Sequence, residues 1–170
     1  MNTLKAEKRS MDVKAKKLRR EGFVTGNLFG REIEGSIPLK FTKKEIEVLL
    51  KNNNKGSQVM LELDGKTYDA LIKEVDYNPL AHTVEEVDFQ ALVSNEMVHS
   101  TAEIILENEE KVMSGVLQDE LKEVAYKALP ADLVDKIKVD VAGMKIGDTL
   151  RVKDLEIAKN KNIHITTDPE

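Results

Sequence analysis

Six cationic side chains gathered near the start of the sequence are the residues best suited to chemistry. They lie within twelve residues of one another and are Arg9, Lys14, Lys16, Lys17, Arg19 and Arg20. Phosphate groups favour this density, because each contact releases condensed counterions and an arginine can fork onto phosphate oxygens or a guanine edge. In a helix, Lys16, Arg19 and Arg20 fall on one side. The segment indicates a polyanion-binding surface, and a solvated basic helix face is the alternative.

Residue types that support catalysis are scattered instead. His82, His99 and His164 are isolated and lack metal-ligand spacing, and no serine lies in a GxSxG motif. Neither GxGxxG nor GxxxxGK occurs, and there are no cysteines. An enzyme would need His82, Asp88 and a serine to converge in a cleft. We therefore expect a non-catalytic binding protein with no cofactor, no metal site and no small-molecule substrate.

Composition places these cations in a folded chain. The sequence has 170 residues, 41% of them hydrophobic and 34% charged, which suits one large or two small globular domains. The net charge of −5 hides a gradient, because residues 1–44 carry 12 Lys or Arg against 5 Asp or Glu. The N-terminus has no apolar stretch and no run approaches a membrane span, so we expect a cytoplasmic protein without membrane contact. The basic first third is the expected working surface.

The first elements are predicted from alternation and from capping residues. Residues 3–9 alternate as a strand does, and Ser10 or Asp12 can cap a helix that Gly22 ends. That polar segment is either a short surface helix or a loop that orders only against a partner. Residues 23–30 and 34–41 favour two strands joined by a turn.

The next elements carry stronger signals. Thr42 and Glu45 fit a capping box that starts a helix with a stripe of Ile46, Leu49 and Leu50. Alternating runs then flank Asp64-Gly65, which is typical of a type I′ hairpin turn. In these runs Val59, Leu61 and Leu63 share one face, as do Tyr68, Ala70 and Ile72. Residues 83–89 add a strand, and the whole predicts a small barrel with antiparallel pairing.

A domain boundary is expected near residues 92–96, where the periodic pattern restarts. Residues 98–108 favour a strand, whereas residues 116–129 fit either a helix or a bulged strand. Pro130 starts a short helical turn. Residues 136–141, 149–157 and 162–167 are predicted as strands, with a turn at 143–147. The fold class is therefore mainly β (α+β), with a barrel domain over 1–92 and a mostly β domain over 93–170.

Several motifs in order also resemble a known family. They are KAEKR, KKLRREGF, NLFG and NPLAHTVEEVDFQAL, which are similar to the bacterial large-subunit ribosomal protein twenty-five family. The second half, with LPADL, IKVDV and IGDTLRVKDL, looks like the extra domain of its long form, the general stress protein Ctc. The resemblance covers nearly the whole chain. It implies a six-stranded barrel with short helices that binds 5S ribosomal RNA, followed by a mostly β domain directed toward neighbouring parts of the ribosome.

The resemblance also implies roles for individual residues. Arg9 matches the family's first-strand arginine, Lys16 and Arg19 match the ends of its basic run, and Lys73 lies on a strand with a polar RNA contact. Asp88 matches the aspartate of its His-hydrophobic-Asp-Phe motif. The chain departs from the family where that histidine is Glu86, where a tyrosine is Phe29 and where Pro-Ala is Thr25-Gly26. A Gly-Lys-Gly loop before the basic run is missing.

The leading hypothesis is a structural component of the large ribosomal subunit. Its barrel would recognise the shape and backbone of an RNA helix, because A-form RNA hides its major-groove edges. The predicted RNA-binding residues are Arg9, Lys14, Lys16, Lys17, Arg19, Arg20, Phe29, Lys73, Glu86 and Asp88. The protein is expected to be a monomer off the ribosome. The alternative is a diverged, stress-linked interaction module with weak or no RNA binding, a reading favoured by Glu86 and the acidic total.

Overall fold

The computed structural model describes residues 2–112, 115–117 and 120–167. The chain forms two compact units that meet in sequence between Glu96 and Met97. Each unit contains its own hydrophobic cluster. Within the described part of the chain, no helix has the length and apolar character needed to cross a membrane.

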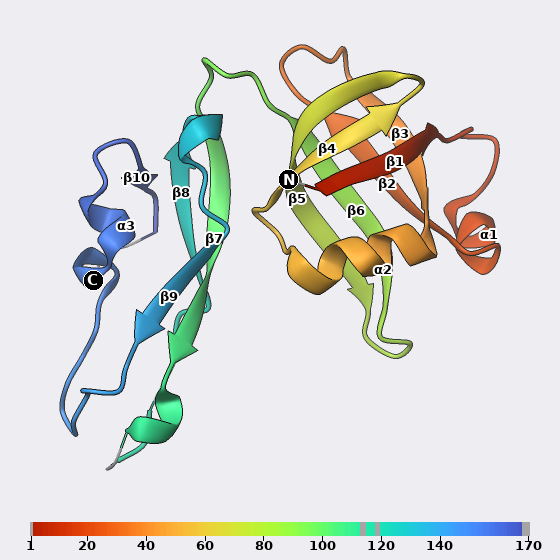
Figure 1. Cartoon of the computed structure of the whole chain (residues 1–170). Coiled ribbons are helices and arrows are strands. Elements are labelled where there is room, and N and C mark those ends of the chain that lie inside the picture. Colours follow the sequence, from red (N-terminus) through yellow and green to blue (C-terminus); the bar gives the residue numbers. More distant parts are fainter. Residues whose placement is uncertain (1, 113–114, 118–119, 168–170) are drawn as a thin grey trace. The chain divides into compact units, whose positions relative to one another are not determined.

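The first unit is a closed barrel of six strands (Figure 1). Its strands are β1 Asn2–Lys8, β2 Phe23–Phe29, β3 Ser36–Thr42, β4 Gln58–Leu63, β5 Lys66–Asn78 and β6 Thr83–Ala91. Their order around the barrel is β1-β3-β2-β6-β5-β4, and β4 pairs with β1 to close it. Two neighbouring pairs, β1–β4 and β2–β6, are parallel, so the expectation of antiparallel pairing is wrong for these two. The predicted six-stranded barrel and mainly β class are confirmed.

Strand alternation fills the barrel interior. Val59, Leu61 and Leu63 of β4 and Ala70 and Ile72 of β5 all join one buried cluster. In the same cluster, the rings of Phe41 and Phe89 lie 5.4 Å apart between their centroids. Burying a side chain of this size contributes about 1.5–3 kcal/mol, so the interior supplies most of the stabilisation of this unit.

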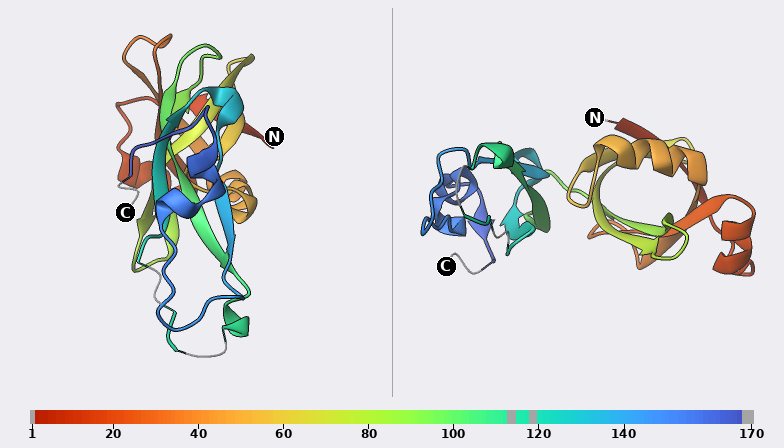
Figure 2. Two further views of the ribbon diagram at one scale, coloured as in Figure 1. Left: turned by 90° about the vertical axis from the view of Figure 1, so that its left-hand side faces the viewer. Right: turned by 90° about the horizontal axis from the view of Figure 1, so that it is seen from below.

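Helix α2 lies across one end of the barrel. It spans Lys43–Asn52, and the Glu45 backbone N–H donates to Thr42 Oγ1 at 3.3 Å, which confirms the Thr42 half of the predicted capping box. Ile46 and Leu49 are buried against the strands, and Leu50 is half-buried. Figure 2 shows the helix running along the rim of the barrel. The stripe predicted from the sequence therefore packs on the core.

The predicted hairpin also forms. Leu63 of β4 pairs with Lys66 of β5, which leaves Asp64 and Gly65 as the two turn residues. Their φ angles are 50° and 78°, both in the left-handed region that a type I′ turn needs.

Helix α1 is shorter than predicted. It spans Ala15–Arg20, and Lys14 precedes it without a side-chain cap. Ser10 and Asp12 do not cap it, because the Ser10 hydroxyl instead accepts from the Asp12 backbone N–H at 3.3 Å and forms a local turn. Gly22 ends the segment as predicted: its φ is 92°, and its N–H donates to the Arg19 carbonyl at 3.2 Å.

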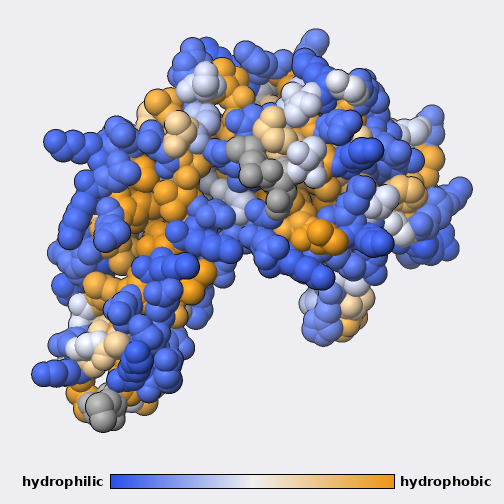
Figure 3. All heavy atoms as spheres, in the orientation of Figure 1, coloured by the Kyte–Doolittle hydropathy of each residue, from blue (hydrophilic) through white to orange (hydrophobic). Residues whose placement is uncertain are grey.

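The second unit is built on an open sheet with the order β10-β8-β7-β9. Its strands are β7 Val98–Glu107, β8 Glu123–Ala128, β9 Lys136–Asp140 and β10 His164–Ile165. Short helical turns connect them, namely η1 Glu109–Lys111, η2 Pro130–Asp132, η3 Val152–Asp154 and α3 Glu156–Lys159. Several members of its cluster are only half-buried, and Figure 3 shows hydrophobic side chains gathered over this sheet.

The ambiguous segment of this unit is now assigned. Between residues 116 and 129 the described part is a strand only over Glu123–Ala128, where Val124, Tyr126 and Ala128 are buried. The Tyr126 hydroxyl donates to the Val134 carbonyl and accepts from the Val134 N–H, both at 2.7 Å. This pair of bonds fixes β8 to the residue that follows the turn η2. That turn starts at Pro130, which confirms the predicted helical turn there.

The strand predicted over 149–157 is wrong. Residues 152–159 form the turn η3 and the single-turn helix α3 instead. The Arg151 backbone N–H donates to Asp154 Oδ2 at 3.0 Å, which closes the chain locally and removes it from the sheet. The strand predicted over 162–167 shrinks to the two residues of β10, His164 and Ile165.

Candidate nucleic-acid interface

Helix α1 presents most of the predicted cations to solvent. Leu18 is 5% exposed and anchors the helix on the barrel. The exposed cationic side chains are those of Lys14, Lys16, Lys17 and Arg20. Lys17 Nζ lies 4.0 Å from Glu21 Oε1, a weak exposed ion pair. Among the described residues no hydrogen bond or ion pair holds the other three side chains, so their charge is available to a partner.

Arg19 is held by the barrel instead. Its Nε donates to the Glu85 carbonyl at 3.1 Å, and its Nη2 donates to Thr25 Oγ1 at 3.2 Å. The Thr25 hydroxyl donates in turn to the Glu85 carbonyl at 3.4 Å. Arg19 therefore joins α1 to both β2 and β6.

Arg9 follows β1 and is half-buried. Its Nη2 donates to the Val13 carbonyl at 3.3 Å, which holds the loop that leads into α1. Its Nε is buried and has no partner among the described residues. Both predicted arginines outside the exposed set are thus engaged with the protein's own backbone.

The outer face of β2 and β6 carries Phe29 and Asp88. Because Val24, Leu28, Val87 and Phe89 fill the core, the alternate residues of both strands point outward. Phe29 is half-buried and lies opposite Gln90 of β6. The other outward residues of β2 between Val24 and Phe29 are Thr25, which lies opposite Glu86, and Asn27. The structure thus places Phe29 and Asp88 on the same outer surface of the barrel.

Asp88 has a clear structural role on this face. Its Oδ1 accepts from the Asn27 backbone N–H at 3.1 Å and from Asn27 Nδ2 at 3.3 Å. These bonds join β2 to β6 between the paired residues Thr25–Glu86 and Leu28–Phe89. At that point a Cβ added to Gly26 would overlap the Val87 carbonyl oxygen. Glycine at this position therefore has a steric reason within this barrel.

Glu86 belongs to a group of four carboxylates on the outer face of β5 and β6. Asp76 lies opposite Glu86, and Glu74 lies opposite Asp88. Burial raises the pKa of Glu86. The charges of Asp88 and Asp76 raise this pKa further, and those of Arg19 and Arg9 lower it. Like charges on opposite strands destabilise a sheet, so this face holds electrostatic repulsion that the two arginines partly relieve.

The pKa of Asp88 is raised as well. Burial is the main cause, and the two hydrogen bonds from Asn27 act in the opposite direction. Asp76 and Glu74 add repulsion. An anionic ligand meets an unfavourable surface here unless a proton or a cation neutralises it.

Lys73 lies in a different electrostatic setting. It is half-buried at an irregularity of the β5–β6 register, between Ile72 and Glu74. Burial lowers its pKa, and the neighbouring charge of Lys55 acts in the same direction while Glu74 opposes both. Lys55 Nζ itself lies 3.4 Å from Glu74 Oε1. The charge of Lys73 is therefore influenced by Lys55, which lies in the loop before β4. The RNA-binding role of Lys73 stays a prediction.

Sequence reasoning did not assign five residues to this surface: Thr25, Asn27, Glu74, Asp76 and Glu85. The alternation around Val24 and Leu28 could have placed Thr25 and Asn27 on the outside of β2. The carboxylate pairs could not have been found, because the β5–β6 register shifts twice, between Ile72 and Glu74 and between Asp76 and Tyr77. Pairing across a bulge is not encoded by simple alternation.

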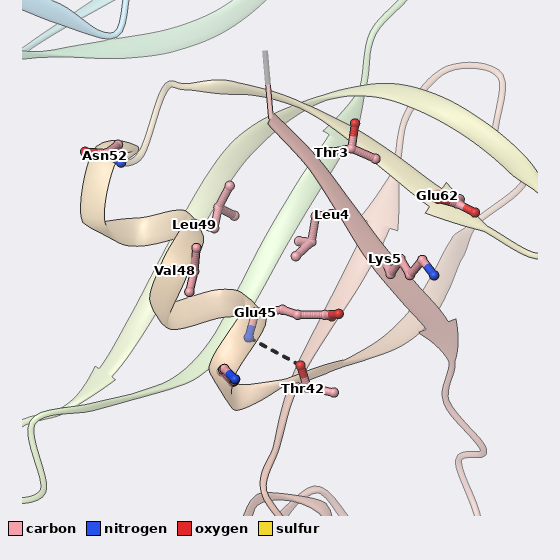
Figure 4. Close-up of a pocket in the computed structure, with 10 residues that line it drawn as sticks. Thr3, Leu4, Lys5, Thr42, Glu45, Val48, Leu49, Asn52 and Glu62 are labelled. Atoms are coloured by element: carbon pink, nitrogen blue, oxygen red, sulfur yellow. Dashed lines mark hydrogen bonds between the residues drawn. The ribbon is translucent and has the colours of Figure 1, made fainter.

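A groove of about 790 Å³ lies between α2 and the strands β1 and β4 (Figure 4). Its lining mixes the cations Lys5 and Lys44 with the carboxylates Glu45 and Glu62. None of the predicted RNA-binding residues lines it. Within the described residues, no group of three or more His, Asp or Glu could hold a metal ion. The cationic surface of α1 is thus the stronger candidate site.

Comparison with known proteins identifies the family. Residues 4–89 match the model of the Ribosomal L25p family, and residues 97–170 match the C-terminal domain of ribosomal protein TL5. The chain belongs to the Ribosomal L25p family. Both matches together cover nearly all of the chain, which confirms the resemblance to the long form that was drawn from the sequence motifs.

Individual relatives extend over both units. The chain is similar to large ribosomal subunit protein bL25 of Carboxydothermus hydrogenoformans, with 32% identity over 173 residues, 96% of this chain and 85% of the relative. The protein of the same name from Bacillus velezensis is 30% identical over 175 residues, 100% of this chain and 85% of the relative. That of Thermoanaerobacter sp. (strain X514) is 29% identical over 158 residues, 92% and 78% of the two chains. The family consists of structural ribosomal proteins, which confirms that the chain is not an enzyme.

Proposed function

We propose that this L25p-family chain is a structural component of the large ribosomal subunit and that its barrel binds 5S ribosomal RNA. The observation that carries the proposal is a set of exposed cations at a helix anchored by Leu18, namely Lys16 and Arg20 on α1 and Lys14 just before it. Their side chains have no hydrogen-bond or ion-pair partner among the residues that the structure describes. Cations that already have an intramolecular partner gain less from a phosphate, because one interaction replaces another. Lys14, Lys16 and Arg20 would form their ion pairs with phosphate without first breaking an intramolecular one.

The expected recognition mode follows from RNA geometry. A-form RNA exposes its backbone and a shallow minor groove, so proteins read it by shape and by phosphate contacts. The cations of α1 would neutralise phosphates, and outward residues of β2 such as Phe29 and Asn27 would set the register. Residues 93–170 would contact neighbouring parts of the ribosome. The protein would then be found on the ribosome in the cytoplasm, and as a monomer when free.

A titration tests the RNA-binding part directly. Purified protein is titrated against 5S ribosomal RNA at 50 and 200 mM salt, with a single-stranded RNA of equal length as the control. With roughly six phosphate contacts the affinity should fall on the order of a thousandfold between the two salt concentrations. Sub-micromolar binding at 50 mM salt with preference for 5S RNA supports the proposal. No binding at 50 mM salt overturns it.

A second candidate is a diverged interaction module that acts off the ribosome. The four carboxylates on β5 and β6 favour it, because they are placed on a surface that borders the proposed RNA site. Sedimentation of cell extracts separates the two candidates. Co-migration of the protein with the large subunit at low salt supports the ribosomal role, whereas a position at the top of the gradient supports the alternative.

A further inference from the structure

We propose that Arg19 is a positioning residue that fixes helix α1 in the free protein, and that it is not itself a phosphate ligand. Resting on the proposed function, this assigns the phosphate contacts to Lys14, Lys16 and Arg20. Sequence alone grouped Arg19 with Lys16 and Arg20, since helical spacing puts the three on one side.

Two of the five N–H donors of Arg19 are already engaged. Its Nε and Nη2 reach two acceptors, the Glu85 carbonyl at 3.1 Å and Thr25 Oγ1 at 3.2 Å. A guanidinium presents its donors in a planar fork, so spanning two acceptors also fixes its orientation. Thr25 is 0% exposed, and its hydroxyl donates to the same Glu85 carbonyl at 3.4 Å. Arg19, Thr25 and the Glu85 carbonyl are thus mutually hydrogen-bonded where β2 lies beside β6.

The charge of Arg19 is likewise used within the barrel. Arg19 and Arg9 are the two cations that lower the pKa of Glu86, against the repulsion of Asp88 and Asp76. A phosphate drawn to Arg19 would approach these carboxylates as well. Lys14, Lys16 and Arg20 have no such anionic partner among the residues that the structure describes.

Helix α1 needs an external anchor of this kind. It has six residues and no side-chain cap. A helix this short is unstable on its own, because nucleation fixes several residues for few hydrogen bonds. Leu18 supplies an apolar contact, and Arg19 supplies the polar connection to β2 and β6. Together they order the segment before any partner binds, which reduces the entropy lost on binding.

Matched variants separate a positioning residue from a phosphate ligand. Arg19→Ala and Arg20→Ala remove the same charge from adjacent positions, and Thr25→Val removes one acceptor of Arg19 without changing any charge. The first readout is amide hydrogen exchange in the free, full-length protein at Leu18, Glu21 and Gly22, whose N–H groups close α1. We expect exchange about tenfold faster in Arg19→Ala and Thr25→Val, as the helix opens more often, and no change in Arg20→Ala.

The second readout is the dependence of 5S RNA affinity on salt. Each lost phosphate contact lowers the slope of log K against log salt by about 0.9 for duplex nucleic acid. Arg20→Ala should lower the slope by about this amount. Arg19→Ala and Thr25→Val should weaken binding several-fold with the slope unchanged. Adding Glu86→Gln to Arg19→Ala should restore part of the lost affinity, because the carboxylate that Arg19 neutralises is gone.

The outcomes that overturn the inference are distinct from failure of the proposed function. A slope that falls equally in Arg19→Ala and Arg20→Ala, with unchanged exchange at α1, would make Arg19 a phosphate ligand. If the wild-type protein binds no 5S RNA, the proposed function fails, and the exchange measurement alone decides whether Arg19 orders α1. If Arg19→Ala does not fold, Thr25→Val carries both readouts.

Discussion

Helix α1 and the outer face of β5 and β6 belong to one barrel, yet they treat charge in opposite ways. On α1, Lys14, Lys16 and Arg20 are exposed and unpaired among the described residues. On β5 and β6, carboxylates stand opposite one another, and the pKa values of Glu86 and Asp88 are raised mainly by burial. The first arrangement keeps charge available to a ligand. The second stores repulsion within the fold.

The difference suggests how a ligand is confined to one part of the barrel. A phosphate backbone is attracted to α1 and repelled by the carboxylates, so the boundary between the two surfaces limits where RNA can lie. Arg9 and Arg19 stand between the two, tied to the backbone of residues 13 and 85. We therefore expect affinity to depend on α1 and orientation to depend on the carboxylate face.

The largest effect is expected from removing the cations of α1. The triple variant Lys14→Ala, Lys16→Ala and Arg20→Ala should weaken 5S RNA binding by roughly 100-fold at 50 mM salt and lower the salt slope by about 2.7. Fluorescence anisotropy at several salt concentrations measures both quantities. A matched control replaces Lys43, Lys44 and Lys51 of α2, which removes the same charge from another surface. Equal losses in the two triple variants would show that net charge, and not α1, determines binding.

The next effect concerns the contact between strands β2 and β6. Gly26→Ala places a methyl group on the Val87 carbonyl, so β2 and β6 must separate, at a cost of about 1–3 kcal/mol in the free energy of unfolding. Urea denaturation measures this loss. Gly143→Ala is the control, because its Cβ would meet nothing within 4 Å. A stability of Gly26→Ala equal to that of the control would mean that the two strands adjust freely.

The barrel was more predictable from the sequence than the second unit. Thr42 and the Asp64-Gly65 pair act through their own neighbours, so their cap and turn follow from local rules. Over 149–157 the apolar residues alternate as in a strand, yet Val152 and Leu155 also fit a helical turn. The Arg151–Asp154 bond decides for the turn, and simple alternation does not reveal it.

The site was predictable only in part, for the same reason. The density of cations identifies α1 without any structure. The hydrogen bonds of Arg19 reach Glu85, 66 positions later in the chain, and Thr25, 6 positions later. The first of these bonds therefore depends on the closed barrel. The opposition of Asp76 and Glu86 depends on two irregularities in the β5–β6 register. Contacts set by long-range register are not contained in local sequence patterns.

A smaller effect tests whether the carboxylate face borders the RNA. Glu86→His removes one anion from the β6 strand and introduces the residue type that the family resemblance leads us to expect there. We expect affinity for 5S RNA to increase by about tenfold, or roughly 1.4 kcal/mol, because repulsion near phosphate is relieved. Glu47→His on α2 makes the same exchange away from this face. Unchanged or weaker binding in Glu86→His would mean that RNA does not approach the outer face of β6.

The smallest expected effect is a dependence of stability on pH. The pKa of Glu86 is raised in the folded protein, so the folded state binds more protons than the unfolded state. Protonation of Glu86 stabilises the folded state fully when the pH lies below the ordinary glutamate pKa of about 4.3. This contribution is lost as the pH rises through the raised pKa of the folded state. The groups that act on Glu86 are Asp88, Asp76, Arg19 and Arg9.

Urea unfolding between pH 4 and 7 measures this dependence for the wild type and for Glu86→Gln. Over this interval the stability of the wild type should fall relative to that of Glu86→Gln, because only the wild type must ionise a carboxyl group whose pKa is raised by burial and by Asp88 and Asp76. Comparing the two proteins cancels the other titrating groups. Parallel pH profiles would show that Arg19 and Arg9 fully offset the repulsion, and the contrast between α1 and the carboxylate face would then be one of geometry alone.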